Sequence, residues 1–388
     1  MNKIVKVESP GRINLIGEHV DYNGGSVLPG AIDKKVEFII ENIKGSTCFI
    51  DSKTINKKFE FELSSLEKSN QHWQNYILGT INNIINKRNL KISAFSCKIN
   101  SSLPIGAGIS SSSALISGLA AGLIEINNLQ IKRSEIVDIV SDVEHNYIGL
   151  KGGIMDQFTI LHGQKNKLVH LECHTRNFKY VNAEFNDYQV ILLNTNVEHN
   201  LANTAYNDRV EECRYALDII NKKYSNKFSY LCEVDSTILE SFKINLDAKI
   251  YNRASFVVNE NLRTHDAAKK LNEFKLVEIG NLMYQSHAGL KDLYEVSCNE
   301  LDFLVDLTKP YNQIIGSRMM GGGFGGCTIN LIHKKFKDEF LDIAHKSYFE
   351  KFRIDVTPIE ISICDGVEIK NLQTCLLYTS DAADEPSS

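Results

Sequence analysis

The residues best suited to chemistry gather in one short segment near the N-terminus. The segment Gly11-Arg-Ile-Asn-Leu-Ile-Gly-Glu-His-Val-Asp-Tyr22 brings together Arg12, Asn14, Glu18, His19 and Asp21. Carboxylates accept pairs of hydroxyl hydrogen bonds, and sheltered charge-assisted bonds of this kind contribute about 1.5–3 kcal/mol each. The segment therefore suits a polyhydroxylated ligand, although a solvated turn bounded by Gly17 and Gly24 also fits its composition.

A second segment, rich in glycine and serine, lies between an expected strand and an expected apolar helix. It reads Leu103-Pro-Ile-Gly-Ala-Gly-Ile-Ser-Ser-Ser-Ser113. Small residues let backbone N–H groups approach an anion, the helix N-terminus adds the positive end of its dipole, and hydroxyl groups are ligands for Mg²⁺. The segment predicts a phosphate-binding loop that lacks the Lys of the Gly-x4-Gly-Lys-Ser/Thr motif, and simple helix capping by serine is the alternative.

A third segment, Met319-Met-Gly-Gly-Gly-Phe-Gly-Gly-Cys327, holds five glycines in six positions. It satisfies the spacing GxGxxG, but a dinucleotide site needs a helix after that motif. The residues from Cys327 to Ile332 alternate like a strand instead. We therefore expect a tight loop that allows close backbone approach to a ligand, or else a structural turn or bulge.

Two carboxylates lie between the second and third segments. Asp156 follows the glycine pair of Gly152-Gly-Ile-Met-Asp-Gln157, and Glu144 stands twelve positions earlier, near the end of an expected helix. A hydroxyl group that attacks phosphorus benefits from a carboxylate that takes or orients its proton, and a bound metal needs oxygen ligands. Asp156 and Glu144 suit these two tasks, although an Asp near glycines is also typical of a cap or turn.

These segments need a framework of mixed strands and segregated helices, which favours an α+β fold over a regular βαβ alternation. In the first half, apolar periodicity predicts strands within 36–63, a helix over 73–86, a strand over 92–99, a helix over 112–126 and a helix from an N-cap at Ser134 to Gly149. In the second half it predicts a buried strand after Tyr188, helices from Asn203 onward, and strands over 327–332 and 356–363 that flank a helix over 340–349.

Composition limits the classes of protein to which the chain can belong. The chain has 388 residues, of which 43% are hydrophobic and 23% charged, so it favours two domains with a large core. The net charge of −5 gives no general electrostatic basis for binding nucleic acid or an anionic membrane. The longest apolar stretch, Leu115 to Ile124, is about half the length of a membrane helix. Nine scattered cysteines without a CxxC pair indicate a reducing, cytoplasmic setting.

The last fourteen residues, 375–388, differ sharply from the Lys-, Asn- and Ile-rich sequence before them. Their text, CLLYTSDAADEPSS, is similar to a translated sequencing adapter. We expect this tail to be non-native and exclude it from the fold.

Taken together, the segments resemble the galactokinase family of the GHMP small-molecule kinases. GRINLIGEHVDY is similar to the sugar signature of that family almost letter for letter, LPIGAGISSSS resembles its nucleotide loop, and MMGGGFGGC resembles its third motif. Further similarity covers EHNYIGLKGGIMDQ (144–157), AYNDRVEEC (205–213), NRASFVVNENLRTHDAAKKL (252–271) and MYQSHAGLKDLYEVSCNELDFLV (283–305). The resemblance extends over nearly the whole chain, to about Ile369.

The resemblance assigns roles residue by residue. It implies Asp156 and Arg12 as catalytic residues. It implies a sugar site made by Glu18, His19, Asp21, Gly153 and Tyr206. It implies ATP binding by Gly106, Ala107, Gly108, Ile109, Ser110, Ser111 and Ser112, with Mg²⁺ near Ser112 and Glu144. With Arg12 beside Asp156, we expect catalysis to rest largely on positioning and electrostatic stabilisation.

The resemblance also implies an architecture. It predicts an N-terminal domain over 1–183, similar to ribosomal protein S5, and a ferredoxin-like C-terminal domain over 184–374, with the active site between them. The implied reaction is phosphorylation of galactose by ATP at the C1 hydroxyl, the first committed step of galactose use by the Leloir pathway. The implied partners are galactose and ATP alone, without nucleic acid, membrane or protein.

One position departs from the family pattern, and two other functions stay open. Ile116 stands where the family frequently has an acidic residue, which bears on the fine geometry of the loop. A non-catalytic sensor of galactose and ATP is one alternative, although the uninterrupted nucleotide loop with Arg12 and Asp156 argues against it. A sibling kinase acting on N-acetylgalactosamine, or on another small alcohol such as mevalonate or homoserine, is the other, and the intact GEHVDY text favours a hexose.

Overall fold

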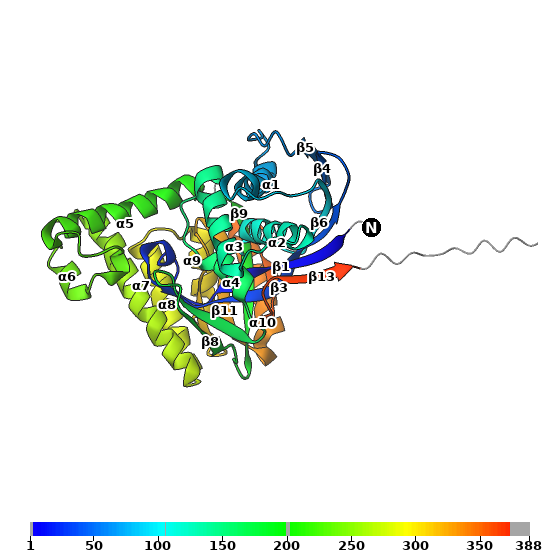
Figure 1. Ribbon diagram of the computed structural model, residues 1–388. Coiled ribbons are helices and arrows are strands. Elements are labelled where there is room, and N and C mark those ends of the chain that lie inside the picture. The colour runs from blue at the N-terminus through cyan, green and yellow to red at the C-terminus, as the bar shows by residue number, and fades with distance from the viewer. Residues whose placement is uncertain (1–2, 105, 199–201, 373–388) are drawn as a thin grey trace, which may run out of the picture.

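A computed structural model of the chain describes residues 3–104, 106–198 and 202–372 (Figure 1). Within these residues the largest sheet has six strands in the order β13-β1-β3-β6-β4-β5. Its neighbours pair antiparallel except for β4 and β6, which are parallel. The strands are β1 (Ile4–Asn14), β3 (Pro29–Asn42), β4 (Thr47–Ser52), β5 (Lys57–Glu62), β6 (Phe95–Ser101) and β13 (Glu368–Leu372).

Four of the described α-helices belong to the same half of the chain: α1 (His72–Asn82), α2 (Ser111–Ile126), α3 (Arg133–Asp142) and α4 (Met155–His162). The apolar helix α2 packs closely on β1 and β3, because glycines face the sheet. A Cβ atom at Gly118 would lie 2.7 Å from the Cβ of Ser9, and one at Gly122 would lie 2.9 Å from a methyl group of Val7. This close packing fixes the N-terminus of α2, where the serine-rich loop ends.

A small antiparallel sheet, in the order β2-β7-β8, continues the first half. It is made of β2 (Ser26–Val27), β7 (Lys167–Glu172) and β8 (Phe178–Asn182). Because β2 follows the sugar-signature segment directly, its pairing with β7 holds the far end of that segment in place.

The second half contains an antiparallel sheet in the order β10-β11-β9-β12. Its strands are β9 (Tyr188–Glu198), β10 (Ile314–Met319), β11 (Gly325–His333) and β12 (Thr357–Glu360), with helix α10 (Lys337–Phe352) between β11 and β12. The connection β-α-β-β-α-β and this strand order are those of a ferredoxin-like domain, which confirms the predicted fold class. The strand after Cys327, which excluded a dinucleotide motif, is β11.

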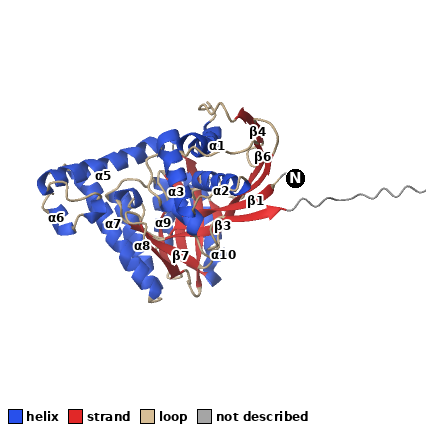
Figure 2. Cartoon of the chain, viewed as in Figure 1, coloured by secondary structure: helices blue, strands red, loops and turns tan. Residues whose placement is uncertain are grey.

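Among the described residues, five α-helices lie between β9 and β10: α5 (Ala202–Tyr224), α6 (Ser236–Glu240), α7 (Ala248–Asn272), α8 (Leu276–Asp292) and α9 (Asn299–Thr308). Figure 2 shows α5, α6, α7 and α8 on the side of the molecule away from the strands of the large sheet. None of the helices in the described ranges has both the length and the apolar character needed to cross a membrane.

Two expectations need correction. The helix predicted to begin at Ser134 begins at Arg133, and its N-cap is Lys132, whose backbone N–H donates to Glu135 Oε2 at 2.9 Å.

The segment after β12 was assigned to the C-terminal domain, but it returns to the first half: Ser362 bonds to Asp33 and β13 pairs with β1. The boundary at residue 183 stays a prediction, and the predicted tail over 375–388 lies outside the described residues.

Candidate active site

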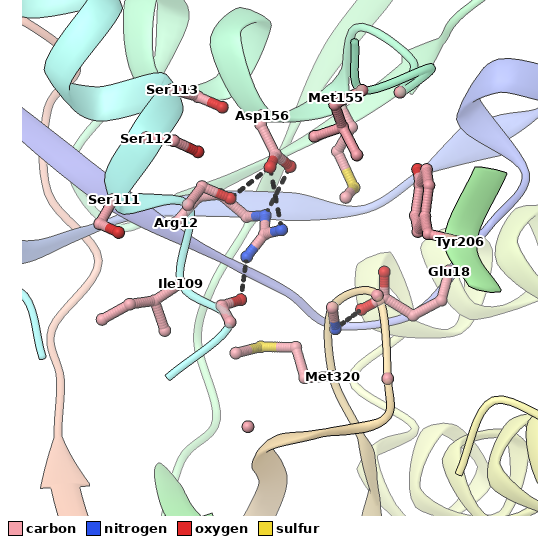
Figure 3. A pocket seen from close by; sticks show the side chains of 18 of the residues that line it. Arg12, Glu18, Ile109, Ser111, Ser112, Ser113, Met155, Asp156, Tyr206 and Met320 are labelled. Atoms are coloured by element: carbon pink, nitrogen blue, oxygen red, sulfur yellow. Dashed lines mark hydrogen bonds and ion pairs between the residues drawn. The ribbon is translucent and has the colours of Figure 1, made fainter. Parts of the chain in front are cut away.

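The three glycine- and acid-rich segments of the sequence meet around one cavity of about 430 Å³ (Figure 3). Its walls come from the loop after β1, the loop before α2, the start of α4, the helix α5 and the loop between β10 and β11. The lining residues named by the sequence are Arg12, Glu18, His19, Asp21, Gly106, Gly108, Ile109, Ser110, Ser111, Ser112, Glu144, Gly153, Asp156 and Tyr206. Among the residues to which the resemblance assigned roles, Ala107 alone is not part of the lining, and its side chain is buried in the core. Asn14 of the first segment is also absent from the lining, and its Oδ1 accepts from the backbone N–H of Leu28 at 3.2 Å.

The cavity contains a two-bond ion pair between Arg12 and Asp156. Arg12 Nε donates to Asp156 Oδ1 at 2.8 Å, and its second terminal nitrogen donates to Oδ2 at 3.1 Å. The remaining terminal nitrogen donates to the carbonyl of Gly108 at 2.7 Å. Burial alone would lower the pKa of Arg12, but the charges of the surrounding carboxylates, Asp156 first, raise it. One guanidinium thus joins the carboxylate to the glycine-rich loop.

The loop before α2 presents its backbone to the same cavity. Gly106 and Gly108 have φ angles of 75° and 69°, and Ser110 also takes the left-handed conformation. The Ser110 hydroxyl does not cap the helix, because it donates to Asp156 Oδ2 instead. The first N–H groups of α2 therefore open on the cavity, which is the arrangement that binds phosphate groups.

Glu144 lies in a π-helical turn, Val143–Ile148, that continues α3. Such turns within α-helices are frequent at functional sites. Its Oε1 accepts a hydrogen bond from Ser113 Oγ at 2.6 Å, and burial raises its pKa to about 8. Sequence reasoning missed Ser113, which the resemblance did not mark. Ile116 is fully buried in the core and is not part of the lining, so it leaves the loop intact.

Glu18 joins the sugar-signature segment to the third glycine loop. Its Oε1 accepts from the backbone N–H of Gly321 at 2.9 Å and from Arg318 at 3.1 Å. Arg318 is fully buried and also donates to the carbonyl of Leu15 at 2.8 Å. No spacing in the sequence marks Arg318, since its partners lie some three hundred residues away.

His19 and Asp21 face the cavity from the same segment. Burial lowers the pKa of His19 to about 3, so its imidazole is neutral. Burial, followed by the charge of Asp156, raises the pKa of Asp21 to about 7. Tyr206 from α5 packs on the His19 ring at a centroid distance of 5.3 Å. Figure 3 shows Glu18 and Tyr206 across the cavity from Arg12 and Asp156.

The third glycine loop has the shape that its composition predicts. Gly321, Gly323, Gly325 and Gly326 all have positive φ angles, between 79° and 128°. A Cβ atom at Gly323 would overlap the carbonyl of Val296, and one at Gly321 would lie 3.0 Å from the carbonyl oxygen of Gly108. The loop therefore lies directly against the loop before α2, which non-glycine residues would prevent.

The donors and acceptors of the cavity fall into two groups. Backbone N–H groups and serine hydroxyls suit an anion at the end of α2, whereas Glu18, His19, Asp21 and Tyr206 suit a neutral polar molecule beside it. The Arg12–Asp156 pair lies between the two groups. Such an arrangement can hold a phosphorylated donor in line with a hydroxyl acceptor.

Sequence models of known families match most of this framework. The model of the GHMP kinases N terminal domain matches residues 75–164, and that of the GHMP kinases C terminal domain matches residues 267–349. A model of the galactokinase galactose-binding signature matches residues 2–41. The fold and these matches therefore define the class of GHMP small-molecule kinases.

Comparison with full-length relatives identifies the family within this class of kinases. The chain is 39% identical to a galactokinase of Thermosipho africanus over 94% of this chain and 99% of the relative, and 37% identical to a galactokinase of Clostridium tetani over 88% and 87%. The crystal structure of Lactococcus lactis galactokinase complexed with galactose has a TM-score of 0.89 and 32% identity, covering 94% and 95% of the two chains. A mevalonate kinase structure shares the fold alone, with a TM-score of 0.65 and 21% identity. The chain belongs to the galactokinase family.

Proposed function

We propose that this protein transfers the terminal phosphoryl group of ATP to the C1 hydroxyl of galactose, giving galactose 1-phosphate and ADP. The observation that carries the proposal is the Arg12–Asp156 pair, placed between an open helix N-terminus and a pocket of carboxylates and a neutral imidazole. The likeness to galactokinases, one of them complexed with galactose, supports the sugar.

The sugar binds between the signature segment and α5. Glu18 and Asp21 supply acceptors for its hydroxyl groups, while His19 and Tyr206 form its polar and aromatic wall. Because Gly153 has no side chain, the Asp21 carboxylate can occupy the space beside it. The intact set of side chains matches a hexose better than a small alcohol, because the carboxylate oxygens that have no protein donor need hydroxyl partners once water leaves.

The nucleotide binds with its phosphates on the loop 106–112, where the N–H groups at the start of α2 face them. Asp156 accepts or orients the proton of the attacking C1 hydroxyl. Arg12 then stabilises the charge that develops on the transferred group, at the cost of loosening its pairing with Asp156. Preorganisation supplies most of the rate enhancement, because the loop already holds both side chains. Arg12 donates to the carbonyl of Gly108, and Asp156 accepts from the Ser110 hydroxyl.

Mg²⁺ fits the oxygen donors at this end of the cavity. Within the described residues no group of three or more His, Cys, Asp or Glu side chains forms a complete metal site. One carboxylate and neighbouring hydroxyl groups are enough for Mg²⁺, because this ion takes one or two carboxylates and completes its shell with substrate phosphates and water. Ser112 and Glu144 would hold the ion, which neutralises phosphate charge when bound.

The proposed setting is the cytoplasm. All eight cysteines in the described part of the chain are free thiols, and burial raises the pKa values of several of them, for example Cys97 and Cys327. Buried thiols of this kind are typical of proteins that work in a reducing compartment.

A substrate panel tests the proposal. Purified protein with ATP and Mg²⁺ should release ADP rapidly with galactose and at least tenfold more slowly with N-acetylgalactosamine, glucose or mevalonate. A coupled ADP assay measures the rates. Binding of galactose and ATP without ADP release would favour the sensor, and faster turnover of N-acetylgalactosamine would favour the sibling kinase.

Gly153 offers a local test of the sugar pocket. In Gly153→Ala the new methyl group would overlap the Asp21 carboxylate and lie 2.7 Å from the Asp21 backbone carbonyl carbon. Because that backbone cannot yield easily, we expect galactose binding to weaken by about 1–3 kcal/mol, as in overpacked sites. Gly152→Ala is the matched control, since its Cβ would meet only the Tyr206 hydroxyl, at 3.9 Å. Equal KM values for galactose in the two variants would refute this placement of Asp21.

A further inference from the structure

We propose that helix α7 holds both ends of the turn 17–26, and that Glu260 and Asn261 on this helix are positioning residues for the sugar. This turn, named the sugar turn below, carries the two carboxylates and the imidazole of the sugar pocket. Neither Glu260 nor Asn261 belongs to the cavity lining, so both act on the sugar only through the turn. The identity of the ligand rests on the proposed function, whereas the hold of α7 on the turn is a property of the free protein.

Two hydrogen bonds join α7 to the two ends of the sugar turn. The backbone N–H of Gly17 donates to Glu260 Oε1 at 3.1 Å, and the backbone N–H of Ser26 donates to Asn261 Oδ1 at 2.8 Å. One helical turn further on, His265 Nε2 lies 3.2 Å from Ser26 Oγ. Because Glu260 and Asn261 are consecutive residues of one helix, a single rigid element fixes both ends of the sugar turn.

The two ends of the sugar turn and α7 are packed tightly together. Gly17 has a φ angle of 99°, and a Cβ atom there would lie 2.8 Å from the carbonyl oxygen of Ser26 and 2.8 Å from Thr264 Oγ1. Thr264 Oγ1 in turn donates to the backbone carbonyl of Glu260 at 2.9 Å. A glycine at position 17 therefore allows the turn to approach the helix closely enough for the bond to Glu260.

The Glu260 carboxylate is fixed in the direction of the sugar turn. It is fully buried, and a buried carboxylate is costly unless donors surround it. Ser286 Oγ on α8 donates to Oε1 at 2.6 Å, and Arg263 Nε on α7 donates to Oε2 at 2.8 Å. Arg263 supplies the opposite charge and Ser286 sets the position of Oε1. The acceptor for Gly17 is thus in place before a sugar binds.

The sugar pocket depends on this hold because Glu18 follows Gly17 directly. The Glu18 carboxylate is held from the other side by the backbone N–H of Gly321 and by Arg318. The backbone of the sugar turn is therefore fixed by α7, and its first carboxylate is fixed by the third glycine loop. A pocket ordered in advance loses less conformational freedom when its ligand binds, so the hold of α7 should appear as sugar affinity.

The phosphate side of the cavity has separate supports. Arg12 and Asp156 bond to each other, and the loop before α2 bonds to both of them, through the Gly108 carbonyl and the Ser110 hydroxyl. Loosening the sugar turn should therefore raise KM for galactose while leaving kcat and KM for ATP nearly unchanged.

Hydrogen exchange of the free protein, followed by mass spectrometry, tests the hold of α7 directly. In Asn261→Ala, peptides that cover 17–26 should exchange at least threefold faster than in the parent protein, because Ser26 loses its acceptor. Asn261→Asp keeps an acceptor oxygen and should restore the parent rate. Asn259→Ala is the control, since Asn259 is exposed on the same helix and donates to the Ser255 carbonyl within it, at 2.8 Å. Parent-like exchange in Asn261→Ala would overturn the proposal.

Kinetics of the same three variants test the consequence for the sugar. Asn261→Ala should raise KM for galactose about fivefold, with kcat and KM for ATP within about twofold of the parent values. Asn261→Asp should return KM for galactose to within about twofold of the parent value. Equal KM values for galactose in Asn261→Ala and Asn259→Ala would overturn the proposal. Absence of turnover in the parent protein would count against the proposed function and leave hydrogen exchange to decide whether α7 holds the turn.

Variants of Glu260 separate positioning from stability. Glu260→Ala and Glu260→Gln both remove the charge that faces Arg263, so both should lower the melting temperature. Only Ala removes the acceptor for Gly17, and it should raise KM for galactose about tenfold, whereas Gln should stay within about threefold of the parent value. KM values that follow the melting temperature, with no difference between Ala and Gln, would remove Glu260 from the proposed role. Where Glu260→Ala does not fold, the half-buried Asn261 series decides the proposal.

Discussion

Replacing Asp156 by Asn is expected to lower kcat by roughly a thousandfold. Asn keeps the shape of the side chain but loses the carboxylate that receives the hydroxyl proton and faces Arg12 through two hydrogen bonds. Binding of ATP should change less than about threefold, because the N–H groups at the start of α2 do not depend on Asp156. Steady-state kinetics give kcat, and calorimetry gives the dissociation constants of ATP and galactose.

The matched control for this variant is Asp138→Asn. Asp138 forms an ion pair with Arg176 at 2.6 Å, and both side chains are more than two-fifths exposed. Exposed pairs of this kind contribute little, so kcat should stay at the parent value. Near-normal turnover in Asp156→Asn would remove Asp156 from the catalytic role, and an equal loss in both variants would point to a general effect of charge.

Galactose affinity should depend steeply on pH because of Asp21. Burial and the charge of Asp156 raise the pKa of Asp21 to about 7 in the free protein. The ionised carboxylate is the form that accepts two hydroxyl hydrogen bonds. Below pH 7 the protein must therefore release a proton to bind the sugar, and the association constant should fall about tenfold for each pH unit. Above pH 7 it should level off.

Calorimetry between about pH 5.5 and 8.5, without nucleotide, measures this dependence. Two buffers of different ionisation enthalpy should reveal release of nearly one proton per sugar bound at pH 6. Asp21→Asn should weaken binding by about 2 kcal/mol, roughly thirtyfold at pH 8, and abolish the acid limb. Persistence of that limb in Asp21→Asn would assign it to another group, with Glu144, whose pKa is raised to about 8, as the first candidate.

The sequence indicated the secondary structure well where apolar periodicity is strong. The helix predicted over 112–126 is α2, over 111–126, and the strand predicted after Tyr188 is β9. Boundaries that depend on a single polar residue were less secure. Ser134 has a side chain typical of an N-cap, but Lys132 occupies the N-cap position, and its backbone N–H donates to the Glu135 carboxylate. The local sequence does not determine which of two nearby polar residues caps the N-terminus of the helix.

Partners distant in sequence were beyond such reasoning. Strand β13 pairs with β1, more than three hundred residues earlier, and the local sequence of β13 does not identify that partner. The bond from Ser113 to Glu144 depends on how α2 packs on α3, and the contact of Arg318 with Glu18 joins the two halves of the chain. A buried arginine has no characteristic spacing, so only the tertiary structure identifies it.

The residues of the site were named from the sequence because its segments resemble the motifs of a known family, whereas their spacing alone left structural turns and caps as alternatives. Arg12 and Asp156, 144 positions apart, were expected to meet, and the structure joins them by two bonds. The proximity of the predicted residues follows from the structure, whereas their roles in catalysis stay predictions. The row of contacts behind His19, through Tyr22 and Tyr294 to Cys213, was not anticipated, because these residues are far apart in the sequence.

The most direct test of the account is phosphorus NMR of protein mixed with galactose, ATP and Mg²⁺. The account predicts one new phosphate monoester whose phosphorus couples to the anomeric proton of galactose, formed in equal amount to ADP. ADP formed without a sugar phosphate, or a phosphate ester at another carbon of the sugar, would contradict the placement of the C1 hydroxyl between Asp156 and the terminal phosphate.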